Sequence, residues 1–268
     1  MMKKLLVTLL FLPMIGFGQK TYVPDDNFET YLEANNLGDG IALNDSVLYS
    51  NVSSVDTLLL NPGLGYPIFD LTGIEDFTSL IHLQCYNVQL SFLDITQNTL
   101  LKHIEIPYNQ LASLDVSQNS FLQKLECEGN NINALDLTNN SDLVYLNCEN
   151  NGLLSLDLRN GNNYNIIRVN IETNFNLTCV NVDDSIYSTN NWNGTGTNIN
   201  GQSISAEFDP QHYYSNNCPS ATAIQEHNTK KELLKVTDLL GRETKGTTNQ
   251  PLFYIYDDGT VEKKIVIE

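Results

Sequence analysis

The middle of the chain, residues 78–161, repeats every 21 residues, four times in register. Each copy has apolar residues or cysteine at positions 3, 6, 8, 13, 16 and 18, and aspartate at position 17. One copy cannot bury its apolar side chains alone, whereas stacked copies bury them in a continuous core, so a fixed period of this length predicts a solenoid. The alternation at positions 6–8 and 16–18 predicts two short strands in each coil, on opposite sides.

Each copy contains L-x-x-L-x-(L/C) twice, and asparagine follows the first strand in the last three copies, at Asn109, Asn130 and Asn151. A buried asparagine there is expected to hydrogen-bond the turn backbone and the neighbouring coil, because buried backbone groups need partners. The pattern resembles the bacterial 21-residue type of the leucine-rich-repeat family. The resemblance implies a mainly β, right-handed solenoid with an N-terminal and a C-terminal cap. The first copy departs from the pattern, because Val88 stands in its asparagine column.

The residues before the repeat predict an export signal and a cap. Residues 1–18 carry two lysines, then an apolar run and small residues, which is typical of a secretory signal peptide. The apolar run is too short to span a membrane, so we expect a mature protein that is secreted or held at the outer-membrane cell surface. Residues 19–54 predict an N-terminal cap with one short helix, which begins after Asp25 or Asp26.

The solenoid extends beyond the four regular copies. A diverged coil precedes them and another follows them, which predicts about six coils over residues 55–184. Residues 185–220 lose the period and are rich in Asn, Ser and Gly, so we expect an irregular C-terminal cap. Trp192 and Phe208 are the expected anchors of this cap on the last apolar ring.

Residues 221–268 predict a linker and a small β-sandwich domain. Two alternating stretches flank Asp257-Asp258-Gly259, a strong hairpin signal. This unit resembles the C-terminal sorting domain of type IX secretion substrates of Bacteroidetes. The resemblance implies that the unit directs the protein across the outer membrane and is then often removed. The residues that carry the resemblance are Val236, Asp238, Gly241, Arg242, Tyr254, Ile255, Tyr256, Asp258, Gly259, Lys263 and Lys264.

The negative charge of the chain is concentrated in its larger part. The net charge is −18, and residues 19–220 hold 24 acidic and 5 basic side chains. Residues 221–268 are near neutral, with 8 acidic and 7 basic side chains. An acidic body repels nucleic acid and favours neutral or basic partners, or divalent cations.

The five cysteines fall into two groups. Cys85, Cys127 and Cys148 share position 8 of the repeat, which favours small buried hydrophobes. They lack C-x-x-C spacing, so we do not expect zinc. Cys179 and Cys218 bracket the end of the solenoid, and an oxidising compartment would favour a disulfide between them.

The outward positions of the first predicted strand form the candidate binding surface. Leucine-rich solenoids usually bind through the exposed residues of this side, and Tyr and Arg are favoured at interaction hot spots. A face that is merely solvated is the alternative. The candidates, at or beside positions 5, 7 and 9, are His82, Gln84, Tyr86, His103, Glu105, Tyr108, Lys124, Glu126, Glu128, Tyr145, Asn147, Glu149, Arg168 and Asn170.

Two columns of the repeat admit a metal, but we favour interpretations without one. His82 and His103 fall about 5 Å apart in adjacent coils, and with Glu105 they could hold a metal. Two unrelated surface imidazoles are the preferred interpretation. The position-17 aspartates either bind turn amides and a following Thr or Ser, which we favour, or attract Ca²⁺ weakly. We therefore expect no metal and no cofactor.

Catalysis has little support in the sequence. It contains no G-x-S-x-G, no H-E-x-x-H and no Gly-rich phosphate loop, so we do not expect an enzyme. We predict a secreted or cell-surface binding protein for protein–protein interaction or adhesion, exported by the type IX machinery. A carbohydrate-binding scaffold is the alternative, because polar and aromatic residues on this face would also suit sugars. Neither nucleic acid nor a membrane span in the mature chain is expected.

Overall fold

The computed structural model describes residues 19–60, 67–193 and 196–219, together with the strands at 233–237, 251–256 and 261–265. The chain divides into two compact units, one up to Pro219 and one from Ser220. Each unit is described by itself. The predicted signal peptide lies outside the described residues.

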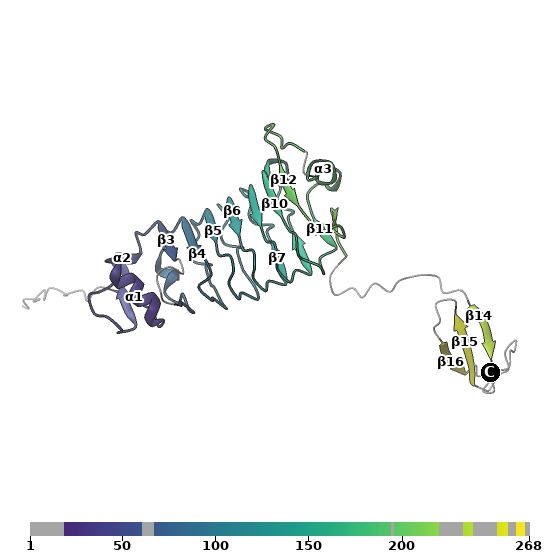
Figure 1. The fold of residues 1–268 in the computed structure, drawn as a ribbon, viewed down its shortest axis with the longest axis horizontal. Coiled ribbons are helices and arrows are strands. Elements are labelled where there is room, and N and C mark those ends of the chain that lie inside the picture. Colours follow the sequence, from purple (N-terminus) through teal and green to yellow (C-terminus); the bar gives the residue numbers. More distant parts are fainter. Residues whose placement is uncertain are drawn as a thin grey trace, which may run out of the picture. The chain divides into compact units, whose positions relative to one another are not determined.

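The first unit is built on a parallel sheet of seven strands that stack side by side (Figure 1). Successive strands pair the same repeat position, as in His82 with His103 and Leu83 with Ile104. The 21-residue period therefore sets the register, and the predicted solenoid is confirmed. In order along the sheet, the strands are β3 (Thr57–Leu60), β4 (His82–Cys85), β5 (His103–Glu105), β6 (Lys124–Glu126), β8 (Tyr145–Asn147), β10 (Arg168–Asn170) and β12 (Ser205–Glu207).

The core is made of the apolar columns of the repeat. The residue at position 6 of each regular copy points inward from its strand, and Leu83, Ile104, Leu125 and Leu146 are completely buried. Burying one such side chain contributes roughly 1.5–3 kcal/mol relative to leaving it exposed. Because every coil adds the same residues to the same columns, the coils form one continuous core.

A second parallel sheet, on the other side of the coils, has four strands: β7 (Ala134–Asp136), β9 (Ser155–Asp157), β11 (Cys179–Asn181) and β13 (Tyr213–Ser215). The prediction of a second strand in every coil is wrong for the first two regular copies, because residues 93–95 and 114–116 are not strands. On this side of the second regular copy, Gln110 N donates to Leu90 O in the coil before, ahead of residues 114–116. A segment without ladder partners is not a strand.

Two columns of buried asparagine join the coils. Asn109 donates from Nδ2 to Cys85 O in the preceding coil and accepts at Oδ1 from Val88 N and Leu90 N. This confirms the predicted role of that column. The second column, at the other turn, was not predicted. It contains Asn98, Asn119, Asn140 and Asn160, which donate from Nδ2 to carbonyl oxygens of the coil before.

The N-terminal cap contains helices α1 (Asp26–Ala34) and α2 (Tyr49–Val52) and the antiparallel strands β1 (Lys20–Tyr22) and β2 (Ser46–Leu48). Asp25 is the N-cap of α1, because its Oδ1 accepts from Asn27 N and Phe28 N at 2.9 Å. Its Oδ2 accepts from Phe69 N and Asp70 N of the first coil. One carboxylate thus starts the helix and joins it to the solenoid, and the 3-10 turn η2 (Ile74–Asp76) follows in that coil.

The C-terminal cap is more regular than the sequence predicts. It contains helix α3 (Ser185–Asn191), which follows the 3-10 turn η3 (Asn163–Asn165) and strands β10 and β11. The expectation of an irregular segment is wrong at β12 and β13, which extend the two sheets in parallel register. Ladder hydrogen bonds to the last coil explain these strands, since backbone pairing does not require the leucine columns. Trp192 is completely buried, and its ring lies 5.4 Å from that of Tyr214, which also contacts Phe208.

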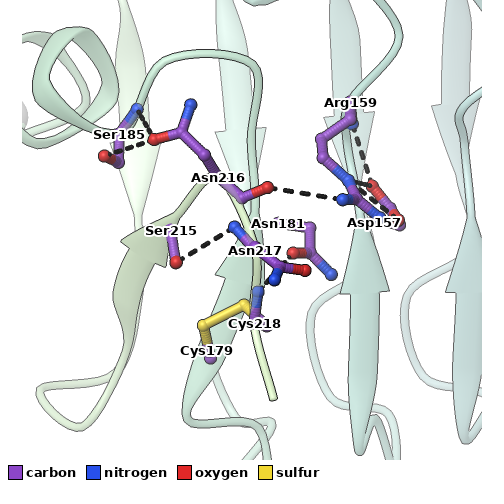
Figure 2. Close-up of a disulfide and its surroundings, with 9 residues drawn as sticks. All are labelled: Asp157, Arg159, Cys179, Asn181, Ser185, Ser215, Asn216, Asn217 and Cys218. Carbon is purple, nitrogen blue, oxygen red and sulfur yellow. Dashed lines mark hydrogen bonds and ion pairs between the residues drawn. A yellow bond between two sulfur atoms is a disulfide. The ribbon is translucent and has the colours of Figure 1, made fainter. Parts of the chain in front are cut away.

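A disulfide joins Cys179 to Cys218, the pair named from the sequence, with their Cα atoms 5.8 Å apart (Figure 2). Cys218 N also donates to Asn181 Oδ1 at 2.7 Å, so residue 218 is held beside β11. Asn216 accepts from Ser185 Oγ at 2.7 Å, and its carbonyl accepts from Arg159 at 3.3 Å. These contacts attach the end of the cap to the last coils.

The second unit contains an antiparallel sheet of β14 (Leu233–Thr237), β15 (Pro251–Tyr256) and β16 (Val261–Ile265). β15 and β16 pair as the two arms of the predicted hairpin, from Pro251 opposite Ile265 to Ile255 opposite Val261. The described strands form one sheet, so the predicted sandwich stays a prediction.

Candidate binding surface on the first sheet

The outward side chains of the seven-stranded sheet, at and just beyond the strands, form what we call the strand face. Each of these strands alternates inward and outward residues, so positions 5 and 7 of each coil point away from the core. Neighbouring coils bring equivalent residues side by side, and most outward side chains on this face are half-buried by one another.

The centre of the strand face is an ion-pair network around Lys124. Its Nζ lies 2.7 Å from Glu105 Oε1 and 3.3 Å from Glu126 Oε1, and Glu105 is also 3.5 Å from His82 Nε2. Burial alone would lower the pKa of Lys124, but the bond to Glu105 and the charge of Glu126 raise it further than burial lowers it. Lys124 is therefore a fixed positive charge on this face.

Tyr145 lies between two cations. Lys124 Nζ is 5.2 Å from the centre of the Tyr145 ring, and the Arg168 guanidinium is 5.6 Å from it. Arg168 is also 3.6 Å from a carboxylate oxygen of Glu207 on β12. Burial, followed by the charge of Glu126, raises the pKa of Tyr145, so its hydroxyl stays protonated. These contacts hold the ring in one position even when no other molecule is bound.

Within the described residues, the two histidines are not part of a converging group of three metal-ligand side chains. The rings of His82 and His103 meet edge to face with centres 5.5 Å apart. Burial, followed by the charge of His82, lowers the pKa of His103. In the described part of the chain, one group of three metal-ligand side chains converges, and it lies in the N-terminal cap. That group is Asp26, Glu29 and Asp45, and its buried member, Glu29, already accepts bonds from Asn44 N and Asp45 N.

Beyond the ends of the strands lies a set of tyrosines and glutamates. The rings of Tyr86 and Tyr108 meet edge to face with centres 5.5 Å apart, and both side chains are exposed. Burial raises the pKa of Glu128, and the charges of Glu126 and Glu149 raise it further. Glu149 Oε2 accepts from Asn170 Nδ2 at 3.0 Å.

Some candidate residues are poorly placed for contact. Asn147 and Asn170 are 8% and 2% exposed, and their Oδ1 atoms accept from Glu149 N and Glu172 N, so they stabilise the turn after the strand. Gln84 is half-buried on β4. Ser205 and Glu207 also belong to this face, because β12 pairs them with Arg168 and Asn170 and so extends the rows. No repeat pattern in the sequence marks these two residues.

No protein-family model and no curated protein sequence matches the chain. Among solved structures, the chain is similar to the functional domain of InlJ from Listeria monocytogenes, with 28% identity and a TM-score of 0.51 over 62% of this chain and 38% of that one. The fold is a leucine-rich-repeat solenoid.

Two weaker similarities involve other proteins of the same kind. A leucine-rich-repeat protein of Leptospira interrogans is 20% identical over 56% of this chain and 40% of that one, with a TM-score of 0.37. An internalin (inlF) of Listeria monocytogenes is 15% identical over 72% of this chain and 68% of that one, with a TM-score of 0.42. This chain spans well under half of the InlJ domain.

The InlJ domain is described as including a cysteine ladder, and the leucine-rich-repeat solenoid described here has an interrupted cysteine column. Cys127 and Cys148 occupy adjacent coils, while Ile106 separates them from Cys85. All three cysteines are buried free thiols, which confirms the prediction that they act as small core residues. Burial raises the pKa of each thiol, so they are unreactive.

The aspartates at position 17 stabilise the turns of the leucine-rich-repeat solenoid, as the favoured interpretation predicts. Asp94 Oδ1 accepts from Thr96 N at 3.0 Å and from Thr96 Oγ1 at 2.7 Å. Asp136 binds Thr138 in the same way, and Asp115 accepts from Ser117 N. These bonds lower the pKa of Asp94, so its carboxylate stays charged.

Part of the segment that resembles a sorting domain is described. Val236 lies in β14, Tyr254, Ile255 and Tyr256 lie in β15, and Lys263 and Lys264 lie in β16; Asp238, Gly241, Arg242, Asp258 and Gly259 lie outside the described residues. Within the described ranges, no helix has the length and apolar character needed to cross a membrane.

Proposed function

We propose that the chain is an exported binding module, secreted or held at the cell surface, that contacts a protein partner through the strand face. The observation that carries the proposal is the network from His82 to Glu207, in which cations, carboxylates and an aromatic ring hold one another across the sheet. Side chains that are ordered before binding lose less conformational entropy when a partner docks.

The location outside the cytoplasm rests on three observations. The disulfide between Cys179 and Cys218 fits an oxidising compartment. Residues 1–18 have the composition of a signal peptide, and residues 230–268 resemble a type IX sorting domain of Bacteroidetes. We therefore propose export through the type IX machinery, which would be a second partner of the chain.

Carbohydrate binding is the second candidate function, and catalysis is not proposed. The exposed pair of Tyr86 and Tyr108 favours the carbohydrate alternative, because aromatic rings present flat apolar surfaces next to polar groups. The ion pairs at the centre favour a protein partner, since charged side chains on proteins complement them.

The binding proposal is tested with purified full chain immobilised on beads and exposed to surface proteins of host or community cells. Substituting Tyr145→Ser together with Arg168→Ser is expected to abolish the retention of proteins held by the wild type. The control is Phe175→Ser, which changes a side chain that is 74% exposed and outside the strands. If the Tyr145→Ser and Arg168→Ser variant retains the same proteins as the wild type, the strand face is not the binding surface. Binding to a glycan array that is lost when Tyr86 is substituted would favour the carbohydrate alternative.

The export proposal is tested in the native host by deleting residues 230–268. Antibody against the solenoid should then detect the protein in the periplasm, whereas the full chain reaches the surface or the medium. Deletion of residues 221–229, in the predicted linker, serves as the control. Normal surface delivery without residues 230–268 would reject the sorting assignment.

A further inference from the structure

In five successive coils, the turn after the first strand has a left-handed residue at the same repeat position. These residues are Asn87, Tyr108, Gly129, Asn150 and Thr173, with φ between 50° and 67°. Glycine and asparagine adopt this conformation at little cost, but a bulky side chain is strained there. Tyr108 is the largest of the five side chains and is half exposed, so its presence is not explained by core packing.

Neighbouring residues hold the ring of Tyr108 over the strand face. Tyr86, in the coil before, contacts it edge to face. Gly129, in the coil after, leaves room for it, because a Cβ atom at Gly129 would lie 2.6 Å from Tyr108 Cδ1. The ring is therefore ordered between two coils while much of it remains exposed.

Two carboxylates follow the tyrosines in the next coils. Tyr108 N donates to Glu128 O at 2.8 Å, and Gly129 N donates to Glu149 O at 2.9 Å, which places these residues in successive turns beside the ring. Neither carboxylate takes part in an ion pair within the described residues. Glu128 Oε2 is buried without a hydrogen-bond partner, and the charges of Glu128 and Glu149 add to burial in raising the pKa of Tyr108.

We propose that this tyrosine–glutamate subsite, made of Tyr86, Tyr108, Glu128 and Glu149, binds a lysine or arginine side chain of a protein partner. Aromatic faces attract cations through the ring quadrupole, and carboxylates form charge-assisted hydrogen bonds with them. The solenoid carries a large excess of negative charge, so a basic segment is also drawn to this face. The proposal rests on the function proposed above and adds the chemistry of the partner.

The test measures binding of a fluorescent peptide of alternating lysine and serine to the full chain by anisotropy, at low and at physiological ionic strength. The same peptide with acetylated lysines is the matched probe. We expect the lysine peptide to bind more tightly than the acetylated one and to weaken with added salt. We expect Tyr108→Asn and Glu149→Gln each to weaken binding about tenfold, which corresponds to about 1.4 kcal/mol.

Tyr108→Asn is chosen because asparagine already occupies this left-handed position at Asn87 and Asn150. The variant should therefore unfold at the same temperature as the wild type or higher. A loss of binding then cannot be explained by a loss of folded structure. Tyr213→Asn, at an exposed tyrosine of β13, and Asp142→Asn, at an exposed acidic residue, are the controls and should bind as the wild type does.

Two results would overturn the subsite. If the lysine peptide does not bind, or binds no better than its acetylated form, the partner is not cationic. If it binds but Tyr108→Asn and Glu149→Gln leave the affinity unchanged, the acidic body binds it elsewhere. In either case, loss of protein capture by the Tyr145 and Arg168 variant would still support the strand face as a binding surface, so the two proposals fail separately.

Discussion

The two sides of each coil come from the same 21 residues, yet their outward positions behave differently. On the strand face, position 5 is occupied in successive coils by His82, His103, Lys124, Tyr145 and Arg168. On the other side, position 17 is aspartate in all four regular copies. Three of those aspartates bind a Thr or Ser two residues later, and the fourth, Asp157, binds Arg159.

The difference separates folding from recognition within one repeat. A residue that recurs in every coil makes the same local bond in every coil, and the turn depends on it. A residue that changes from coil to coil makes contacts only with its neighbours on the surface, so it is free to suit a partner.

The two sides of the coil share one hydrophobic core, and substitutions in that core should have the largest effect. Leu125 in β6 and Leu135 in β7 belong to one coil and are both buried. We expect Leu125→Ala and Leu135→Ala each to lower the free energy of unfolding by about 4 kcal/mol, because both leave a cavity in one core. Urea denaturation followed by circular dichroism measures this, with Leu154→Ala, at a leucine that is 54% exposed, as the control. A cost confined to one side would show that the sides have separate cores.

The disulfide lies on the second side only, so its loss should destabilise the second sheet more than the first. Substituting both Cys179 and Cys218 with serine is expected to lower the free energy of unfolding by about 3 kcal/mol, because the closed loop restricts the unfolded chain. Hydrogen exchange should show greater loss of protection at β13 than at β5 in the middle of the first sheet. Equal loss in both strands would mean that the solenoid unfolds as one unit.

The repeat made the coils and their register predictable, because identical spacing forces equivalent residues into the same column. Leu83, Ile104 and Leu125 are examples, and all three are buried in register. Spacing could not predict β12, since that strand is held to Arg168 and Asn170 by backbone bonds and carries no leucine column. Backbone pairing of this kind leaves little trace in a sequence.

The candidate surface was predictable as a set of positions but not as a set of contacts. Alternation placed Lys124 and Tyr145 outward, but their 5.2 Å contact depends on side-chain conformations. Asn170 was assigned outward by the same rule and is buried, because its side chain turns to bind the backbone at Glu172 and the carboxylate of Glu149. The left-handed backbone at Tyr108 carries no signal in its residue type, since tyrosine is not expected there.

The asparagine columns support both sides of the coil, so they should be equally sensitive to substitution. Asn130, after the first strand, and Asn119, at the opposite turn, are buried and donate to carbonyl oxygens of the coil before. We expect Asn130→Ala and Asn119→Ala each to lower the free energy of unfolding by about 2 kcal/mol, because buried carbonyl groups lose their partners. Thermal unfolding monitors the loss, and exposed Asn131→Ala is the control. A much smaller effect at Asn119 would mean that the first sheet alone sets the stability of the coil.

The smallest expected effect is a difference in the pH at which the two sides lose stability. The pKa of His103 is lowered from 6.5 by burial and by His82, and that of Asp94 is lowered from 3.8 by its bonds to Thr96. In both cases the folded state binds fewer protons than the unfolded state, so stability is complete above the unfolded pKa and is lost as the pH falls through the folded one. His103→Gln should therefore reduce the loss of folding stability that begins as the pH falls below about 6.5. Asp94→Asn should reduce the loss that begins near pH 3.8. Both groups are largely solvated, so each effect stays below about 1 kcal/mol. Urea midpoints across pH at constant ionic strength measure it, and a His103→Gln profile that coincides with the wild type from neutral pH down to pH 5 would show that the histidine pair does not contribute to folding.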